Sequence, residues 1–312
     1  MFEQVKPVLL NASIGIVGLL FLGTVIILGL TRAYPHQDFE ELRARLRSWW
    51  WMAAIFLLAI LIDNVISLCL FGFMSFLAFK EYLSLIPTRR ADRRVLLWAY
   101  LAIPIQYYWA AIGWYGMFII FIPVYMFLFL PVRMVLIGET QGFLRAAGTV
   151  HWGLMTTVFS LSHAGFLLML PEQGNPHAGS AGLVLFLVFL TELNDVAQYV
   201  WGKLWGRHPI IPKISAHKTW EGFLGGLITT TLAAVALAPM LTPLTGYHSF
   251  VVGILIALAG FLGDVSISAL KRDLGIKDSG QLLPGHGGIL DRVDSLTYTA
   301  PLFFHFVRYF YY

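Results

Sequence analysis

One stretch near the C-terminus, Ser268–Asp294, gathers side chains whose types and spacing could carry out chemistry. It holds four basic residues, four acidic residues, a histidine and five glycines, in a chain that is 58% hydrophobic. Charges beside a membrane helix are costly unless water, a metal ion or an anionic ligand compensates them. We therefore expect this stretch to bind phosphate groups together with a divalent cation.

Two aspartates, Asp264 and Asp291, are the candidate metal ligands. Asp264 shares a predicted helix face with Ser268 and Lys271, so that a carboxylate, a hydroxyl and an ammonium group lie side by side. Asp291 and Asp294 follow at i, i+3 spacing on a second predicted helix. Mg²⁺ takes one or two carboxylates and completes its coordination with water and substrate phosphates, which fits aspartates on separate helices.

The glycine-rich turn around His286 permits close approach of a ligand to the backbone. Gly285, Gly287 and Gly288 surround the histidine, and glycine tolerates conformations that other residues avoid. His286 either donates a hydrogen bond to a phosphate or makes a structural hydrogen bond within the turn, and both interpretations stay open. As the one nearby nitrogen ligand, it makes zinc a weaker candidate than magnesium.

Two upstream segments add polar residues near predicted helix ends. Asp195 shares a helix face with Gln198 and Tyr199. This face favours a water-filled cavity, although hydrogen bonding between helices explains Gln198 and Tyr199 as well. Further along, Lys213 and Lys218 precede a helix start whose free amides could bind a phosphate. The positive-inside rule explains these two lysines equally well.

The composition places these residues in a polytopic membrane protein. The 312-residue chain has 12% charged residues and a mean hydropathy of +0.74. A membrane helix needs about 20 apolar residues. We predict an all-α transmembrane helical bundle of about ten spans, with a cytoplasm-facing polar cavity built by the C-terminal half. The predicted spans are Leu9–Leu30, Trp49–Ile62, Val65–Leu85, Val95–Ile112, Trp114–Val132, Val150–Leu170, Gly182–Trp205, Glu221–Leu241, Phe250–Leu270 and Leu296–Tyr311.

Lysine and arginine gather in alternate loops between these spans. Such loops face the cytoplasm in membrane proteins. The alternation places both termini outside and the polar stretch in the cytoplasm, in a bacterial inner membrane. The intervening loops, which contain no lysine or arginine, lie around positions 63, 113, 172–180 and 242–249.

Several classes of function are excluded by the sequence. The single cysteine, Cys69, rules out an internal disulfide and a cysteine-based zinc site. The chain contains no P-loop, Rossmann glycine pattern or G-x-S-x-G elbow. The basic balance of 21 Lys and Arg against 17 Asp and Glu is explained by topology and phosphate binding, so nucleic acid is not a predicted partner.

The polar stretch resembles the signature of a known family. The run S-A-L-K-R, four residues, K-D-S-G, two residues, then L-P-G-H-G-G-I-L-D-R-V-D is similar, without a break, to the signature of the phosphatidate cytidylyltransferases, also called CDP-diacylglycerol synthases. The likeness extends from about residue 195 to the C-terminus. Two segments depart from it. Residues 195–199 read D-V-A-Q-Y where the family commonly has D-S-G-A-Y, and residues 215–220 read S-A-H-K-T-W where it has S-P-x-K-T-W.

The resemblance assigns roles to individual residues. It implies that Asp264 and Asp291 occupy the metal-binding positions. The predicted catalytic residues are Lys218, Lys271, Arg272, Lys277, Asp278, His286, Arg292 and Asp294. The predicted substrate-binding residues are Asp195, Lys213, Ser215 and Ser268. Residues 1–170 are then an N-terminal transmembrane region for anchoring and packing, and residues 171–312 a C-terminal catalytic region.

The implied reaction is attack by a lipid phosphate, typically that of phosphatidic acid, on the α-phosphorus of CTP. The products are CDP-diacylglycerol and pyrophosphate, in a phospholipid-synthesising step that depends on Mg²⁺, with a second monovalent or divalent cation left open. Such a transfer needs positioning and charge stabilisation rather than a covalent protein intermediate. The predicted partners are CTP, a lipid phosphate and membrane lipids, and a homodimer is left open. Two alternatives remain, a CTP-dependent lipid kinase and a membrane transporter.

Overall fold

The computed structural model describes residues 6–36, 38–87, 89, 92–280 and 287–312. Within them the chain is almost entirely helical, as its apolar composition predicts, with one two-stranded antiparallel hairpin as the exception. The elements are α1 (Pro7–Ala33), α2 (Glu40–Ile62), α3 (Asn64–Leu85), α4 (Arg93–Ala111), α5 (Tyr115–Ile120), the π-helical turn η3 (Phe121–Met126), α6 (Phe127–Val135), α7 (Phe143–Leu154), the π-helical turn η4 (Met155–Phe159), α8 (Ser160–Leu167), the 3₁₀ turn η5 (Glu172–Gly174), α9 (Gly179–Trp205), β1 (Pro209–Ile211), β2 (Ser215–Thr219), α10 (Trp220–Leu241), α11 (Gly246–Asp273), α12 (Leu290–Val293) and α13 (Leu296–Tyr311).

Seven helical segments of the described chain are long and apolar enough to cross a membrane. They are α1, α2 from Leu42 onward, α3, the continuous run from α5 to α6, α9, α10 and α11. The other three predicted spans coincide with α4, with the run from α7 to α8, and with α13, which has 16 residues. The all-α membrane bundle is therefore confirmed, and the chain is an integral membrane protein. The count of ten spans stays a prediction.

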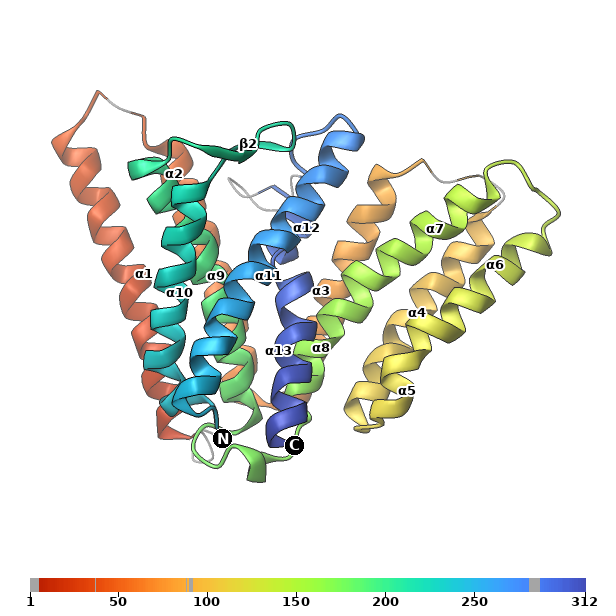
Figure 1. Ribbon diagram of the computed structural model, residues 1–312, viewed down its shortest axis with the longest axis horizontal. Helices are drawn as coiled ribbons and strands as arrows, with labels where there is room; N and C mark the ends of the chain where they lie inside the picture. Colours follow the sequence, from red (N-terminus) through yellow and green to blue (C-terminus); the bar gives the residue numbers. More distant parts are fainter. Residues whose placement is uncertain (1–5, 37, 88, 90–91, 281–286) are drawn as a thin grey trace.

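The chain termini and the polar connections lie at opposite ends of the bundle (Figure 1). The start of α1 and the C-terminus are drawn at one end, whereas the hairpin lies at the other and α12 lies in the half of the bundle nearer to the hairpin. The α1–α2, α3–α4 and α6–α7 connections share the end that carries the hairpin (Figure 1). Arginines lie in these connections or in the adjoining helix turns, namely Arg32, Arg43, Arg89, Arg93, Arg133 and Arg145. The basic segments that the charge alternation predicts on one side of the membrane thus lie at one end of the bundle.

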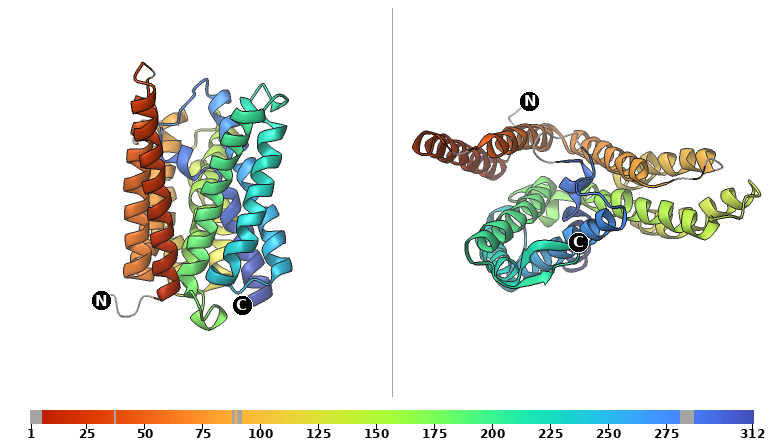
Figure 2. Two further views of the ribbon diagram at one scale, coloured as in Figure 1. Left: turned by 90° about the vertical axis from the view of Figure 1, so that its left-hand side faces the viewer. Right: turned by 90° about the horizontal axis from the view of Figure 1, so that it is seen from above.

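Helix α9 forms the centre of the bundle and α1 its edge. The most apolar 18-residue window of α9 is 67% buried within the protein, whereas that of α1 is 0% buried. Seen from above, α1 to α4 form a row along one side, and α9, α10 and α11 lie beside it (Figure 2). Because α1 has few neighbours, its apolar surface is left to contact lipid.

Helices α9 and α10 pack closely through glycines. A Cβ atom built on Gly225 would lie 2.3 Å from Cγ of Trp201, and one built on Gly226 would lie 2.4 Å from Cγ of Gln198. Small residues let membrane helices approach one another in this way. The packing fixes the side of α9 that carries Asp195 close to the start of α10, where the hairpin ends.

Candidate active site

The hairpin places Lys218 against α11. Thr219 ends β2 and caps α10, because its Oγ1 accepts a hydrogen bond of 3.2 Å from the N–H group of Gly222. The neighbouring Lys218 forms an ion pair with Asp264 of α11. The other carboxylate oxygen of Asp264 accepts a hydrogen bond of 3.1 Å from Ser268 Oγ. The carboxylate and the hydroxyl of the predicted face are thus in contact. The third predicted member, the ammonium group of Lys271, pairs with Asp291 of α12, and Lys218 from β2 pairs with Asp264.

The ammonium group of Lys218 is held in its charged form. Burial by itself lowers the pKa of this group, but the carboxylates of Asp264 and Asp195 outweigh burial and raise the pKa above the ordinary lysine value. The Lys218 side chain is 19% exposed. It therefore presents a fixed positive charge of the kind that binds phosphate as a point charge.

A second lysine–aspartate pair lies beside the first. Lys271 Nζ of α11 is 2.7 Å from Asp291 Oδ1 of α12. The other oxygen, Asp291 Oδ2, accepts hydrogen bonds from the N–H groups of Ser279 (2.9 Å) and Gly288 (3.2 Å). Burial raises the pKa of Asp291, but Lys271 and these hydrogen bonds outweigh burial and lower it. Asp291 is therefore ionised. It contacts both ends of the signature loop, which is the segment of residues 274–289 between α11 and α12.

Two further carboxylates face the first pair from other helices. Ser295 Oγ donates to Asp195 Oδ1 of α9 at 3.1 Å, and the Ser295 N–H group donates to Asp294 Oδ1 at 2.7 Å. Asp294 is 9% exposed. Burial, together with the charges of Asp264 and Asp195, raises the pKa of Asp294 well above its ordinary value. Three helices and the turn after α12 thus bring four carboxyl groups close together, which favours a cation.

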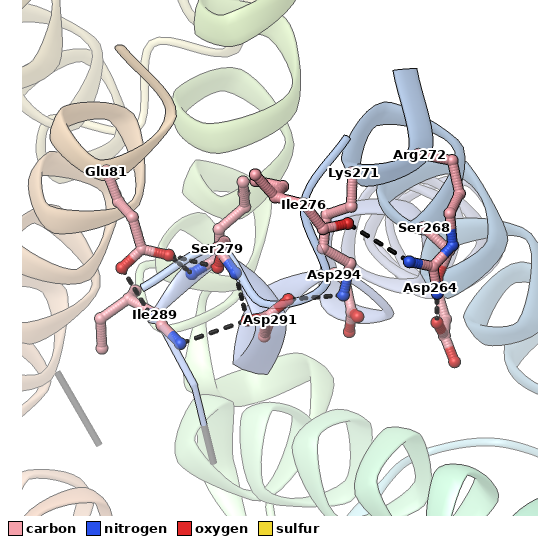
Figure 3. Close-up of polar contacts among 12 residues, drawn as sticks. Glu81, Asp264, Ser268, Lys271, Arg272, Ile276, Ser279, Ile289, Asp291 and Asp294 are labelled. Atoms are coloured by element: carbon pink, nitrogen blue, oxygen red, sulfur yellow. Dashed lines mark hydrogen bonds and ion pairs between the residues drawn. The ribbon is translucent and has the colours of Figure 1, made fainter. Parts of the chain in front are cut away.

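The signature loop is also held from the N-terminal half of the chain, by Glu81 of α3. Glu81 Oε1 accepts hydrogen bonds from Ser279 Oγ (2.5 Å) and from the N–H group of Leu290 (3.0 Å). Glu81 Oε2 accepts a hydrogen bond of 2.9 Å from the N–H group of Ile289. In Figure 3, Asp291 is drawn between Glu81 on one side and Asp264 on the other. Glu81 therefore fixes the start of α12, on which Asp291 is carried.

Sequence reasoning missed Glu81. The available signal was an acidic residue near the end of an apolar span, which usually has a partner. That partner, Ser279, lies 198 positions further along the chain, so sequence spacing could not reveal it. The contact also explains why residue 288 is glycine, since a Cβ atom on Gly288 would lie 1.9 Å from Glu81 Oε1.

Comparison with known proteins identifies the family of the chain. Residues 43–310 match the sequence profile of the Cytidylyltransferase family. The chain belongs to this family. It is 46% identical over 291 residues to an uncharacterized protein, YnbB, of Escherichia coli, covering 93% of this chain and 95% of that protein.

Named enzymes match over shorter stretches. The phosphatidate cytidylyltransferase of Mycobacterium leprae is 39% identical over 155 residues, which cover 50% of this chain and 47% of that enzyme. The phosphatidate cytidylyltransferase of Staphylococcus saprophyticus is 40% identical over 120 residues, which cover 38% of this chain and 46% of that enzyme. The chain thus spans about half the length of these named relatives.

The other predicted site residues differ in how exposed they are and in what they contact. Three of them are exposed, namely Lys213, Lys277 and Asp278. Ser215 is half-buried on β2. Arg292, on α12, has a buried Nε atom that lacks a hydrogen-bond partner in the described part of the chain. His286 lies outside the described residues. None of these observations tests their predicted roles, which stay predictions.

Arg272 binds backbone carbonyl groups. Its Nε donates to the carbonyl oxygen of Ile214 at 3.0 Å, and its Nη1 donates to that of Ile276 at 3.3 Å. The guanidinium group thus connects the hairpin turn to the chain that leaves α11 (Figure 3). Its exposed position leaves its third nitrogen, Nη2, available to a phosphate.

We expect Arg272→Lys to lower activity about tenfold although the charge is kept, because lysine has no planar fork to bind two acceptors in fixed directions. The measurement is kcat/KM for CTP in the purified variant. Arg94→Lys, at an exposed arginine in the first turn of α4 outside the candidate site, serves as the control for the same exchange. Equal activity of Arg272→Lys and the unmodified protein would contradict this role.

A cavity of about 230 Å³ adjoins the Lys218–Asp264 pair. A larger cavity of about 490 Å³, at the α3–α4 and α6–α7 connections, contains none of the predicted site residues. The smaller cavity is therefore the candidate substrate site. Its lining residues are Asp195, Gln198, Tyr199, Ser215, His217, Lys218, Thr219, Gly222, Phe223 and Asp264.

The donor set of the site suits magnesium better than zinc. Among the described residues, no three His, Cys, Asp or Glu side chains are arranged to hold a metal ion by themselves. Magnesium does not need such a cage, because one or two carboxylates suffice when water and substrate phosphates supply the other ligands. Each carboxylate oxygen can accept two bonds, so the ion pairs of Asp264 and Asp291 leave acceptor capacity for a cation.

Proposed function

We propose that this cytidylyltransferase is a phosphatidate cytidylyltransferase, which makes CDP-diacylglycerol and pyrophosphate from CTP and phosphatidic acid. The observation that carries the proposal is the pair of lysine–aspartate contacts, Lys218–Asp264 and Lys271–Asp291. A magnesium–triphosphate complex needs groups of both charges. The aspartates can bind Mg²⁺, and the lysines can bind the triphosphate.

In the proposed reaction, an oxygen of the lipid phosphate forms a bond to the α-phosphorus of CTP. The bond between that phosphorus and the oxygen bridging to the β-phosphate breaks, and pyrophosphate leaves with the bonding electrons. Ionised lipid phosphate is already nucleophilic near neutral pH, so no general base is assigned.

The protein contributes positioning and charge. Asp264 and Asp291 would hold Mg²⁺, which when bound supplies positive charge to the phosphoryl oxygens. Lys218 and Lys271 neutralise phosphate charge from two different elements, and Arg272 adds a planar donor at the mouth of the site. Held in fixed directions, such groups need little reorganisation as charge shifts toward the leaving group.

We further propose that the site faces the cytoplasm of a bacterial inner membrane. The hairpin lies at the end of the bundle where arginines flank the α1–α2, α3–α4 and α6–α7 connections, and α12 lies in the half nearer to that end (Figure 1). Basic segments beside membrane helices face the cytoplasm. CTP could reach the site from that side. The lipid would enter sideways, because withdrawing acyl chains from the bilayer costs about 0.8 kcal/mol per methylene.

The test is pyrophosphate release by the purified protein in lipid nanodiscs, given Mg²⁺, CTP and phosphatidic acid. We expect release that requires all three components and a lipid product that contains CMP joined to phosphatidic acid. Formation of CDP in place of pyrophosphate would replace this proposal with a CTP-dependent lipid kinase. Lipid movement across the bilayer without CTP would favour a transporter.

A further inference from the structure

Gln198 of α9 is a buried amide that the reaction described above does not use. It is 5% exposed, and both Nε2 and Oε1 lack a hydrogen-bond partner in the described part of the chain. A buried polar group loses its hydration, and leaving it unpaired is unfavourable. Two unpaired atoms on one side chain therefore point to a ligand that binds both.

The position of Gln198 indicates which ligand this is. The side chain lines the same cavity as Lys218 and Asp264. On its other side it packs against the backbone of α10, where a Cβ atom on Gly226 would lie 2.4 Å from Gln198 Cγ. Packing of Cγ against α10 thus holds the side chain of a residue that lines the candidate substrate site.

Residues next to Gln198 on α9 are exposed. Tyr199 lines the cavity next to Gln198 and is 55% exposed. Val196 and Val200 on the same helix are 47% and 42% exposed. On a helix long and apolar enough to span the membrane, such exposed apolar residues face lipid. A lipid headgroup can therefore approach Gln198 without leaving the bilayer.

The hydrogen-bonding groups of the Gln198 amide indicate which kind of lipid it can bind. An amide offers an acceptor oxygen and two N–H donors. Ester carbonyls and ionised phosphate only accept hydrogen bonds, so diacyl phosphatidic acid would leave Gln198 Oε1 unpaired. A hydroxyl group both donates and accepts, and it can therefore serve both atoms of the amide.

We propose that Gln198 is a specificity-determining residue that binds a hydroxyl group of the acceptor lipid. The preferred acceptor is then a lipid phosphate with a free hydroxyl on the carbon next to the phosphate-bearing carbon, as in a monoacylglycerol phosphate. This inference rests on the proposed cytidylyl transfer. It names monoacylglycerol phosphate as the better acceptor, with phosphatidic acid as an acceptor of lower kcat/KM. The segment that contains Gln198 is also one of the two that depart from the family signature, which has alanine at this place.

The experiment compares monoacyl- and diacylglycerol phosphate with the same acyl chain as acceptors, in the unmodified protein and in Gln198→Met. The unmodified protein should favour the monoacyl lipid in kcat/KM. Methionine keeps the length of the side chain but removes both polar atoms, so this preference should fall about ten- to a hundredfold. Because unpaired polar atoms are removed, the Tm of Gln198→Met in the absence of substrate should stay equal or rise.

The matched control is Gln106→Met in α4, which is also a buried glutamine but does not line this cavity. Gln106 Nε2 donates to the carbonyl oxygen of Phe118 at 3.1 Å and to Ser162 Oγ at 3.2 Å. Its replacement should lower Tm and leave the lipid preference unchanged. Gln198→Met and Gln106→Met are thus expected to differ both in Tm and in lipid preference.

Two results would overturn the proposal. One is an unchanged lipid preference in Gln198→Met. The other is a change confined to the choice between CTP and UTP, which would assign the amide to the nucleobase. If no lipid phosphate is a substrate, the proposed function fails. In that case the rise in Tm that monoacylglycerol phosphate causes without CTP still tests Gln198. Loss of this rise in Gln198→Met would support binding of the lipid by Gln198. An equal rise in Gln198→Met would contradict it.

Discussion

Replacing either Asp264 or Asp291 by asparagine should lower pyrophosphate release by 10²–10³-fold, on the order expected when one electrostatic stabiliser is removed. Asparagine keeps the shape of the side chain but removes the charge that would hold Mg²⁺. The Mg²⁺ concentration that gives half-maximal rate should rise in parallel. Loss of an ion pair alone would lower the rate without this shift, so the magnesium titration separates the two roles.

Asp273→Asn is the matched control for this experiment. Asp273 is an exposed aspartate at the end of α11, two residues after Lys271. Its replacement changes net charge equally and should leave both the rate and the magnesium dependence unchanged. Near-normal turnover of purified Asp264→Asn or Asp291→Asn would remove that residue from the metal site.

The second large effect is expected at Glu81, on a helix that sequence reasoning assigned to anchoring and packing. Glu81→Ala leaves three donors of the signature loop without their acceptor. Hydrogen bonds to a charged group contribute about 1.5–3 kcal/mol each. We therefore expect kcat to fall a hundredfold or more, at roughly 1.4 kcal/mol per tenfold. Lys80→Ala, at the exposed neighbouring residue, should have little effect.

A double-mutant cycle with Gly288 tests whether Glu81 acts by positioning the loop. The three atoms nearest to a Cβ on Gly288 all belong to Glu81, at 1.9, 2.4 and 2.5 Å. Gly288→Ala alone should therefore impair activity by displacing the carboxylate. In the Glu81→Ala background the methyl group has room, so it should add little further loss. Additive losses would show that the two residues act independently.

The membrane fold could be predicted because it depends on properties that are local in the sequence. Apolar runs of sufficient length define spans whatever they pack against, and the predicted spans coincide with helical segments of the structure. The hairpin from Pro209 to Thr219 was not predicted, since its strands are short and read as a polar loop. The division at residue 170 stays a prediction, although Glu81 contacts the C-terminal region.

The residues of the candidate site could be predicted in part. Asp264 and Ser268 share a helix face because their spacing of four matches the helical repeat, and the structure joins them. The pairing of Lys218 with Asp264 and of Lys271 with Asp291 depends on how separate elements pack. The sequence placed the four residues in one site but could not tell which lysine meets which aspartate.

By itself, the sequence determined the membrane class, the helical elements and the charged groups of the signature, because each depends on composition or on spacing within one segment. The tertiary structure alone decided that Glu81 holds the signature loop and that Gln198 lines the cavity with both amide atoms unpaired. These facts depend on contacts between helices far apart in the chain. The packing of α3 against the loop and of α9 against α10 creates them, and no local pattern records such packing.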